Sequence, residues 1–386
     1  MKQAASGQWD VFCKIVDNHG DIGVCWRLSR QLASEHGLRV RLFIDDLMAA
    51  KSIIPQLDPK LPQQELIGVS VCAWPDATTV PAKTVLETFS CGLPMAFLEK
   101  MVAQQAHWIN LDYLSAEDWV ASFHGKPSPH PQLPITKHFF FPGFELNTGG
   151  LLREQALIQQ RADFIEDSQA QRQFWQALGY EQGVNDLPGS LKLSLFCYPQ
   201  ANIKGLLDGL LSYRQAITVF FPASPLHRPD SLFADFEKTT ERSFKKHHVT
   251  VQLLPFLSQA NYDRLLWSCD LNFVRGEDSW LRAIWAGQPF IWQPYLQDEG
   301  THLIKMQAFL TRYTAHAPIE LAKQIEAAHY AWSDAKSQAN PVFCQLLLTT
   351  VQHKAYAKQA AERLANAPDL ASKLLRFNEK LMENKV

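Results

Sequence analysis

Short apolar runs alternate with amphipathic stretches along most of the chain, and this alternation predicts βα units around parallel sheets. In the first half a strand is expected within 9–16, then a helix over 24–37 that ends at Gly37, then a strand within 38–46. Further strands are expected within 67–74, 83–89, 107–114 and 137–144. In the second half strands are expected within 191–198, 215–221, 248–254, 270–276 and 288–294. The helices expected between them cover 201–214, 258–269 and 279–287. The pattern therefore predicts an α/β protein.

Two segments interrupt this rhythm. Residues 125–134 hold four prolines and predict an irregular surface loop rather than a strand. The run EKTTERSFKKHH, residues 237–248, is densely charged and is interpreted as the solvated face of a helix.

The length and the pattern together predict two domains. A chain of 386 residues is long for one core, and the βα rhythm restarts after a polar helical stretch at 151–183 that could bridge two domains. We expect a first Rossmann-like domain at 1–155 plus about 365–386, and a second one at 156–364. A C-terminal helix after the break at Pro368 would cross back to the first domain. Two such domains facing across a central cleft would bind ligands at the carboxyl ends of their strands.

Composition narrows the function classes. The formal net charge of −2 gives no global basic field for nucleic acid. Seven scattered cysteines without metal-ligand spacing fit a reducing compartment. The start MKQAASGQWD lacks the apolar core of a signal peptide, and no stretch reaches the length of a membrane span. A cytoplasmic protein without nucleic-acid or membrane partners is expected.

The stretch VRGEDSWLRAIWAGQP, residues 274–289, places a charged turn between a strand and a helix. Ser279 or Asp278 is expected to cap that helix. Its start, together with Arg275, could hold a diphosphate without a metal, whereas Glu277 would accept hydrogen bonds from sugar hydroxyls. A plain salt-bridged cap is the alternative. The continuation through Ala286 to a Gly-x-Pro resembles the nucleotide-sugar-binding half of two-Rossmann (GT-B) glycosyltransferases.

The loop DNHGDIG, residues 17–23, follows the first strand. Its two glycines, Gly20 and Gly23, do not complete a GxGxxG fingerprint, which makes a dinucleotide-dependent dehydrogenase a weak hypothesis. Locally, Asp21 could be an N-cap and Asp17 a turn former. Opposite a nucleotide sugar, either carboxylate could instead orient an acceptor and take its proton.

Beyond these patterns, five stretches carry a resemblance to a known family: FCKIVDNHGDIGVCWRLSRQLA, VLETFSCGLP, WINLDYLSAEDW, FFFPGFELNTGGLLRE and VRGEDSWLRAIWAGQPFIWQPYLQDEGTHL. They resemble the protein-arginine rhamnosyltransferase family EarP, which modifies bacterial translation elongation factor P. The resemblance runs in blocks from about residue 10 to residue 305. It implies a GT-B fold with an acceptor-binding first domain and a nucleotide-sugar-binding second one, dTDP-β-L-rhamnose as donor, and inverting transfer onto an arginine of the factor. Because Arg275 and the helix start can stabilise the departing diphosphate, no metal and no other cofactor is expected.

The resemblance also implies roles for single residues. Asp21 matches the proposed general base, Asp17 the second acid of its loop, and Glu277 the acid needed for donor use. Other donor contacts fall on Asn18, Gly20, Phe196, Tyr198, Phe256, Gln259, Arg275, Gly276, Asp278 and Ser279. From the residues alone, the aromatic members of this set fit core packing equally well.

Two other functions remain open on the sequence. One is transfer to a small-molecule or lipid acceptor, and the other is a non-catalytic nucleotide-sugar-binding module that docks to the translation factor. For a basic protein partner, Asp17, Asp21, Asp112, Glu117 and Asp118 are candidate guides.

Overall fold

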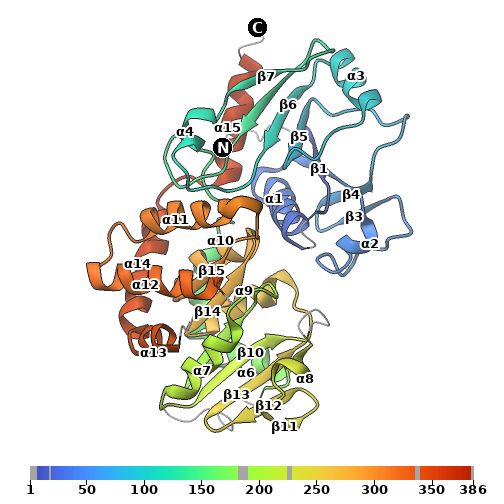
Figure 1. Ribbon diagram of the computed structural model, residues 1–386. Helices are drawn as coiled ribbons and strands as arrows, with labels where there is room; N and C mark the ends of the chain where they lie inside the picture. The colour runs from blue at the N-terminus through green and yellow to red at the C-terminus, as the bar shows by residue number, and fades with distance from the viewer. Residues whose placement is uncertain (1–6, 17–18, 181–189, 224–227, 335–339, 384–386) are drawn as a thin grey trace. The chain divides into compact units, whose positions relative to one another are not determined.

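The chain folds into two compact units, and Figure 1 shows the elements of each. Unit 1 comprises residues 1–155 and 365–386, and unit 2 comprises residues 156–364. The computed structural model describes residues 7–16, 19–180, 190–223, 228–334 and 340–383. Each unit has its own sheet, so each is described by itself.

Unit 1 is built on a sheet with the strand order β3-β4-β2-β1-β5-β6-β8-β7. Its strands are β1 (Gln8–Cys13), β2 (Arg39–Ile44), β3 (Gln63–Leu66), β4 (Val69–Ala73), β5 (Thr84–Thr88), β6 (His107–Leu111), β7 (Pro127–Pro129) and β8 (Thr136–Phe140). Its helices are α1 (Gly20–His36), α2 (Leu47–Ala50), α3 (Met95–Ala103), α4 (Trp119–Phe123) and α15 (Leu370–Glu383). The inner strands β4, β2, β1, β5, β6 and β8 pair in parallel.

The apolar runs of unit 1 are continuous because helices cover its inner strands. Phe12 of β1 stacks on Phe43 of β2 at 4.9 Å between ring centroids, and Phe97 of α3 meets Phe12 edge-on at 5.0 Å. Helix α1 packs on β1 and β2 (Figure 1). It ends at Gly37, whose φ of 66° lies in the left-handed region, as the sequence predicted.

The prediction of an irregular loop at 125–134 is wrong for part of that segment. Pro127–Pro129 forms β7, which pairs antiparallel with β8 at the edge of the sheet. Proline lacks an N–H but is tolerated on an edge strand, where one side of the backbone has no partner strand to bond.

Unit 2 is built on a second sheet, with the strand order β11-β12-β13-β10-β9-β14-β15. Its strands are β9 (Leu191–Leu195), β10 (Ile217–Pro222), β11 (Glu237–Thr240), β12 (Ser243–Lys246), β13 (Val249–Leu254), β14 (Leu271–Arg275) and β15 (Phe290–Gln293). Its helices are α5 (Leu157–Glu166), α6 (Ser168–Ala177), α7 (Ile203–Ser212), α8 (Pro229–Leu232), α9 (Gln259–Ser268), α10 (Asp278–Ala286), α11 (Thr301–Tyr313), α12 (Ile319–Ser333), α13 (Asn340–Leu348) and α14 (Thr350–Ala365). Strands β13, β10, β9, β14 and β15 pair in parallel.

The helical interpretation of residues 237–248 is wrong. They form the antiparallel strands β11 and β12, and β12 pairs with β13 so that Phe244 lies opposite Val251. Phe244 is buried, whereas Lys245 beside it is exposed. The segment itself shows no alternation of period two, since β11 is exposed throughout and Ser243 and Phe244 are both buried. Pairing with β13, which the local sequence does not encode, makes it a strand.

The C-terminal helix α15 belongs to unit 1, where it packs on α1 and β6. Asn378 accepts a hydrogen bond from the Thr84 hydroxyl at 3.1 Å, and the ring of Phe377 lies 5.5 Å from that of Phe140. Helix α14 stops at Ala365, and α15 begins at Leu370 beyond Pro368, where the sequence predicted the break. The return of the chain end to the first sheet is therefore confirmed.

No helix among the described residues is both long and apolar enough to cross a membrane.

Candidate active site

The loop DNHGDIG and two neighbouring loops lie at the carboxyl ends of the parallel strands of unit 1. Strands β1, β5 and β6 are parallel neighbours, so the loops that leave their carboxyl ends meet there. These loops span residues 14–19, 89–94 and 112–118. A site at these carboxyl ends is therefore formed by three segments that are far apart in the sequence.

Asp21 lies in the first turn of α1, and its side chain turns back toward the loop before the helix. The residue is 2% exposed. Its Oδ2 accepts a hydrogen bond from the Val16 N–H at 2.9 Å, and its Oδ1 accepts one from the Tyr113 hydroxyl at 3.2 Å. The N-cap position is taken by His19, so Asp21 is not the N-cap that local sequence allowed.

The other residues of the loop fall in different places. Gly20 is the first residue of α1, and the Gly23 N–H donates to the His19 carbonyl at 3.0 Å. The exposed His19 ring lies 3.1 Å from the Ser52 hydroxyl through Nδ1. Asp17 and Asn18 lie outside the described residues, so their roles stay predictions.

The buried thiol of Cys13 lies near Asp21 and near the partly buried thiol of Cys91. The neighbouring thiol of Cys25 and burial hold the pKa of Cys13 well above its ordinary value. Burial raises the pKa of Cys91 to about 12. These thiols are therefore protonated at neutral pH, which makes them poor nucleophiles.

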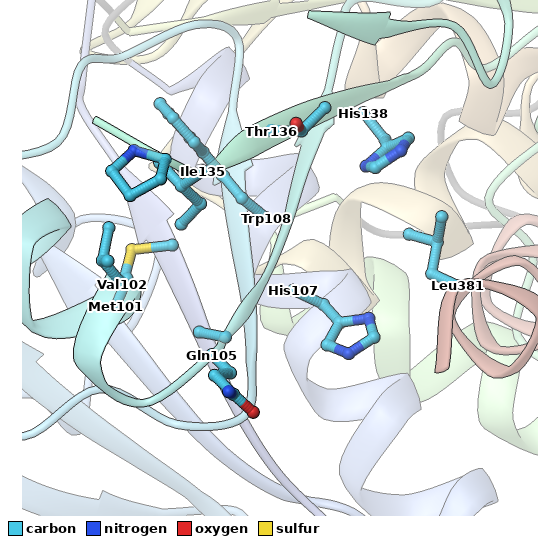
Figure 2. Close-up of a pocket in the computed structure, with 11 residues that line it drawn as sticks. Met101, Val102, Gln105, His107, Trp108, Ile135, Thr136, His138 and Leu381 are labelled. Carbon is cyan, nitrogen blue, oxygen red and sulfur yellow. The ribbon is translucent and has the colours of Figure 1, made fainter. Parts of the chain in front are cut away.

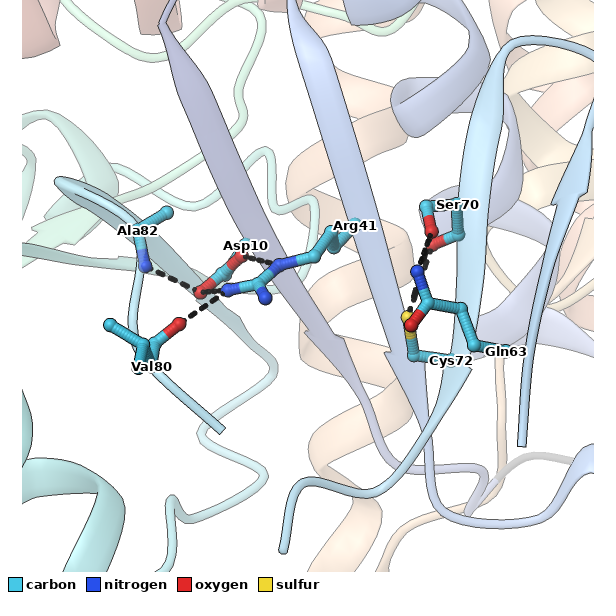
Figure 3. Close-up of polar contacts among 7 residues, drawn as sticks. All are labelled: Asp10, Arg41, Gln63, Ser70, Cys72, Val80 and Ala82. Atoms are coloured by element: carbon cyan, nitrogen blue, oxygen red, sulfur yellow. Dashed lines mark hydrogen bonds and ion pairs between the residues drawn. The ribbon is translucent and has the colours of Figure 1, made fainter. Parts of the chain in front are cut away.

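A second buried carboxylate in unit 1 has a structural partner. Asp10 of β1 accepts hydrogen bonds from Arg41 Nε and Nη2, each at 2.8 Å, and from the Ala82 N–H at 2.8 Å (Figure 3). Burial raises the pKa of Asp10, while Arg41 opposes that shift. Because Asp10 is fully buried and paired with Arg41, it ties β1 to β2 and is closed to a substrate.

Unit 1 also contains a cavity of about 500 Å³, shown in Figure 2. His107, Trp108, His138 and Leu381 are among the residues that line it. His107 is the first residue of β6, whereas the loop that carries Tyr113 follows the last residue of that strand. The cavity therefore lies at the opposite end of β6 from the Asp21 loop.

The charged turn of unit 2 lies at the carboxyl end of β14. Arg275 is the last residue of that strand, and its Nη1 donates to the Cys197 carbonyl at 3.0 Å. Its guanidinium carbon lies 4.8 Å from the centre of the Tyr198 ring. The Tyr198 N–H in turn donates to Gln293 Oε1 at 2.7 Å. The turn thus joins the ends of β9, β14 and β15.

The expected capping of α10 is wrong. Glu277 occupies the N-cap, and within the part of the chain that the structure describes it makes no side-chain capping hydrogen bond. Asp278 is already in the first turn, and the Ser279 hydroxyl bonds backward to the N–H and the carbonyl of Arg275. Ser279 therefore braces the turn instead of the helix. Gly276 has a φ of 59°, which a glycine adopts without strain.

The aromatic residues expected near a nucleotide base fall at the same edge of the sheet. Phe196 follows β9 and meets Tyr262 of α9 edge-on at 4.8 Å. Gln259 is the first residue of α9, and Phe256, in the loop before it, is 59% exposed. Because β13, β9 and β14 run in the same direction, all these positions follow carboxyl ends.

Two residues near these strand ends, one in each unit, were not among the site residues expected from the sequence. Tyr113 lies in a stretch interpreted as the end of a strand, and Tyr262 in one interpreted only as a helix. Burial raises the pKa of Tyr262 and keeps its hydroxyl neutral. Tyr113 carries no sequence signal of its own beyond its place two residues after β6, which does not distinguish it from other loop residues.

The acidic positions proposed to guide a partner make local contacts. Asp112 accepts a hydrogen bond from the Tyr113 N–H at 2.8 Å, and Glu117 accepts one from the Ser115 hydroxyl at 3.0 Å. Asp118 is the exposed N-cap residue of α4. Their part in recognition stays a prediction. The described residues include no group of three or more His, Cys, Asp or Glu side chains that could hold a metal ion.

Each unit is a largely parallel sheet with helices, and two such α/β units are the architecture of the GT-B class of glycosyltransferases. MurG of Acinetobacter baumannii shares this fold with a TM-score of 0.50 at 11% identity, over 96% of this chain and 98% of that chain. The family model described as Elongation-Factor P (EF-P) rhamnosyltransferase EarP matches residues 9–379. The chain belongs to this family.

Individual relatives agree with the family model. The protein-arginine rhamnosyltransferases of Pseudomonas putida and Pseudomonas aeruginosa are 42% and 41% identical to the chain, and each match covers 96% of this chain and 98% of the relative. A solved structure described as the structural basis for EarP-mediated arginine glycosylation of translation elongation factor EF-P matches with a TM-score of 0.68 at 30% identity. That match covers 97% of this chain and 99% of that chain.

Proposed function

We propose that the protein transfers L-rhamnose from dTDP-β-L-rhamnose to a guanidinium nitrogen of one arginine on translation elongation factor P. The bond between the anomeric carbon and the diphosphate oxygen breaks, and a bond from that carbon to the nitrogen forms with inversion. The leaving dTDP keeps the electron pair, and the nitrogen loses one proton. Membership of the family supports this choice of sugar, acceptor residue and acceptor protein.

The acceptor sets the chemical difficulty. An arginine guanidinium has a pKa of about 12.5 to 13.8, and its lone pairs are delocalised, so it is a weak nucleophile. A carboxylate can hold it by a charge-assisted hydrogen bond and accept the proton as the new bond forms. In this proposal Asp21 does so, and Asp17 or Glu277 holds the rest of the guanidinium.

The leaving group needs stabilisation of a different kind. Negative charge grows on the diphosphate as the bond to the sugar breaks, and a fixed cation near it lowers the barrier. Arg275 is fixed by Cys197 and Tyr198, so it can supply this charge without reorganising. The start of α10 contributes N–H groups beside it. We expect the reaction to proceed without a divalent metal.

The thymine base and the deoxyribose would contact the aromatic side of the unit 2 site. Phe196 and Phe256 offer ring faces for stacking, and Gln259 offers an amide for hydrogen bonding. Glu277, at the start of α10, would accept hydrogen bonds from the sugar hydroxyls.

The observation that carries the proposal is the carboxylate of Asp21. It is 2% exposed and receives two hydrogen bonds, one on each oxygen. A helix-capping acid bonds to N–H groups of its own helix. Asp21 instead bonds to the loop after β1 and to Tyr113, in the loop after β6.

The proposal is tested by mixing the protein with dTDP-β-L-rhamnose and elongation factor P and measuring the intact mass of the factor. One added deoxyhexosyl group, mapped by fragmentation to a single arginine, is expected, and chelator should not reduce its yield. Factor in which that arginine is replaced by lysine is the matched control and should stay unmodified. If both ligands bind but no mass is added, the protein is a binding module and the proposal fails.

A further inference from the structure

Two of the stretches that carry the family resemblance have no role in the reaction as described so far. They are VLETFSCGLP, which contains all but the first residue of β5 and the loop after it, and WINLDYLSAEDW, which contains all but the first residue of β6 and the loop after it. Strand β5 pairs with β1 on one side and with β6 on the other. Both loops therefore emerge beside the loop that leads into α1 and Asp21.

The loop after β6 reaches Asp21 through Tyr113. The Tyr113 hydroxyl donates to Asp21 Oδ1 at 3.2 Å, while the Val16 N–H donates to Oδ2 at 2.9 Å. With a donor on each oxygen, the plane of the carboxylate is fixed as well as its position. Tyr113 is 40% exposed, so it lies at the surface and not in the core.

The ring of Tyr113 is held by the loop after β5. Phe89 stacks on it with 4.3 Å between ring centroids and 12° between ring planes. Phe89 and Ser90 have φ values of 55° and 52°, a left-handed backbone that non-glycine residues rarely adopt. Such strain persists only where surrounding contacts impose it, and it gathers at functional sites.

Contacts from the sheet impose this strained turn. The Phe89 N–H donates to the Leu111 carbonyl at 2.7 Å. The buried Asn110 side chain accepts hydrogen bonds from the N–H of Ser90 at 3.1 Å and from its hydroxyl at 3.2 Å. The Gly92 N–H donates to Glu87 Oε1 at 2.8 Å, which fixes the far end of the turn.

Asn110 also supports the loop of Tyr113. Its amide nitrogen donates to Asp112 Oδ2 at 3.3 Å, and Asp112 Oδ1 accepts the Tyr113 N–H at 2.8 Å. One buried side chain of β6 thus orders both halves of the aromatic pair. Contacts of this kind fix a reacting group in place before substrate binds.

We infer that Tyr113 is a positioning residue for Asp21: its hydroxyl orients the carboxylate that holds the acceptor guanidinium, and the Phe89 turn holds Tyr113 in place. This inference rests on the proposed function, because it assumes that Asp21 is the base. It assigns Tyr113 no proton to carry and no contact with the donor. Loss of the hydroxyl should therefore slow turnover without weakening donor binding.

The test compares Tyr113→Phe with Tyr330→Phe in the full-length protein. Tyr330 of α12 is a matched control, because it is 38% exposed and its hydroxyl also donates to a side chain, that of Gln307. Steady-state rates are measured with dTDP-β-L-rhamnose and elongation factor P, dTDP affinity by calorimetry, and folding by the melting temperature. Tyr113→Phe should lower kcat about ten-fold, the effect of one hydrogen bond to a charged group. The KM for donor, the dTDP affinity and the melting temperature should stay unchanged, and Tyr330→Phe should match the wild type throughout.

A double-variant cycle separates positioning from an independent role. In the Asp21→Asn background, Tyr113→Phe should change the residual rate by less than about two-fold, because the group it orients is gone. The inference is overturned if Tyr113→Phe lowers the rate by the same factor in the wild type and in Asp21→Asn. It is also overturned if Tyr113→Phe alone leaves kcat unchanged. If Asp21→Asn itself keeps the wild-type rate, the base assignment fails and this inference fails with it.

The aromatic stack is tested by Phe89→Gly. Glycine keeps the left-handed backbone without strain and removes only the ring. The variant should fold, bind dTDP as the wild type does, and show a reduced kcat that Tyr113→Phe does not reduce much further. A Phe89→Gly variant with the wild-type kcat would show that the stack does not hold Tyr113.

Discussion

The guanidinium carbon of Arg275 lies 4.8 Å from the centre of the Tyr198 ring, so a stacked cation joins the ends of β14 and β9. The same guanidinium donates to the Cys197 carbonyl. An arginine held by a ring face and a carbonyl has little freedom to move, and it keeps the rest of its fork for a ligand. This relationship makes Arg275 the strongest candidate for contact with the diphosphate.

Arg275→Lys should weaken dTDP binding about 10- to 100-fold, because an ammonium cannot stack, hold the carbonyl and present a planar fork together. Calorimetry with dTDP measures this directly. Arg264→Lys is the matched control, since Arg264 of α9 also lies over a ring, that of Phe164 at 5.7 Å. The control should bind dTDP normally, and normal binding by Arg275→Lys would remove Arg275 from the site.

The ion pair of Asp10 and Arg41 should contribute to the stability of unit 1 and not to catalysis. Asp10→Ala removes a fully buried carboxylate and leaves Arg41, whose side chain is 21% exposed, without it. The expected loss is ~3 kcal/mol in the free energy of unfolding, at the low end for a buried pair because water reaches Arg41.

Denaturant unfolding followed by tryptophan fluorescence checks this loss. Replacing both partners, as Asp10→Leu with Arg41→Met, should recover part of the stability. At temperatures where Asp10→Ala is folded, its dTDP affinity should be that of the wild type, because Arg275 lies in unit 2. An Asp10→Ala variant as stable as the wild type would contradict this account.

Two buried histidines should make unit 2 sensitive to acid. Burial lowers the pKa of His329 to about 4 and that of His353 to about 3. Because these pKa values are lower in the folded protein than in the unfolded chain, the unfolded chain binds protons at a higher pH than the folded protein does. The stabilising effect of neutral imidazoles is therefore complete above the unfolded pKa of 6.5 and is lost as the pH falls toward these values.

His353→Leu tests this linkage. Between about pH 7 and pH 5 the wild type should lose on the order of 2 kcal/mol per buried histidine, and the variant should lose about half of the total. The exposed His247, at the turn between β12 and β13, serves as a control when replaced by asparagine, which tolerates its positive φ. Equal pH dependence in His353→Leu and the wild type would refute the assignment.

Much of the fold could be predicted from the sequence because local signals agree with it. The apolar runs became the inner strands, and glycines end both α1 and α10, where Gly37 and Gly287 adopt the left-handed backbone. The misses have physical causes: an edge strand tolerates Pro127, and pairing with β13 makes a strand of the charged segment that holds Phe244.

The site could be predicted only in part. Chain order alone placed Arg275 at the end of an apolar strand and Asp21 where the loop after the first strand leads into a helix. Tyr113 could not be found, because its contact with Asp21 depends on the order of β1, β5 and β6 in the sheet. The backward bond of Ser279 to Arg275 depends on turn geometry that an N-cap motif does not distinguish. The catalytic roles of Asp17 and Glu277 stay predictions.

The central claim is that the Asp21 carboxylate takes the proton of the acceptor arginine. The most direct measurement is the rate of single-turnover rhamnosylation of elongation factor P by Asp21→Asn, followed by intact mass, beside its dTDP affinity and melting temperature. A folded variant that binds dTDP normally and reacts ~10² to 10⁴ times more slowly than the wild type is the predicted result. A folded, dTDP-binding variant that modifies the factor at close to the wild-type rate would contradict the account.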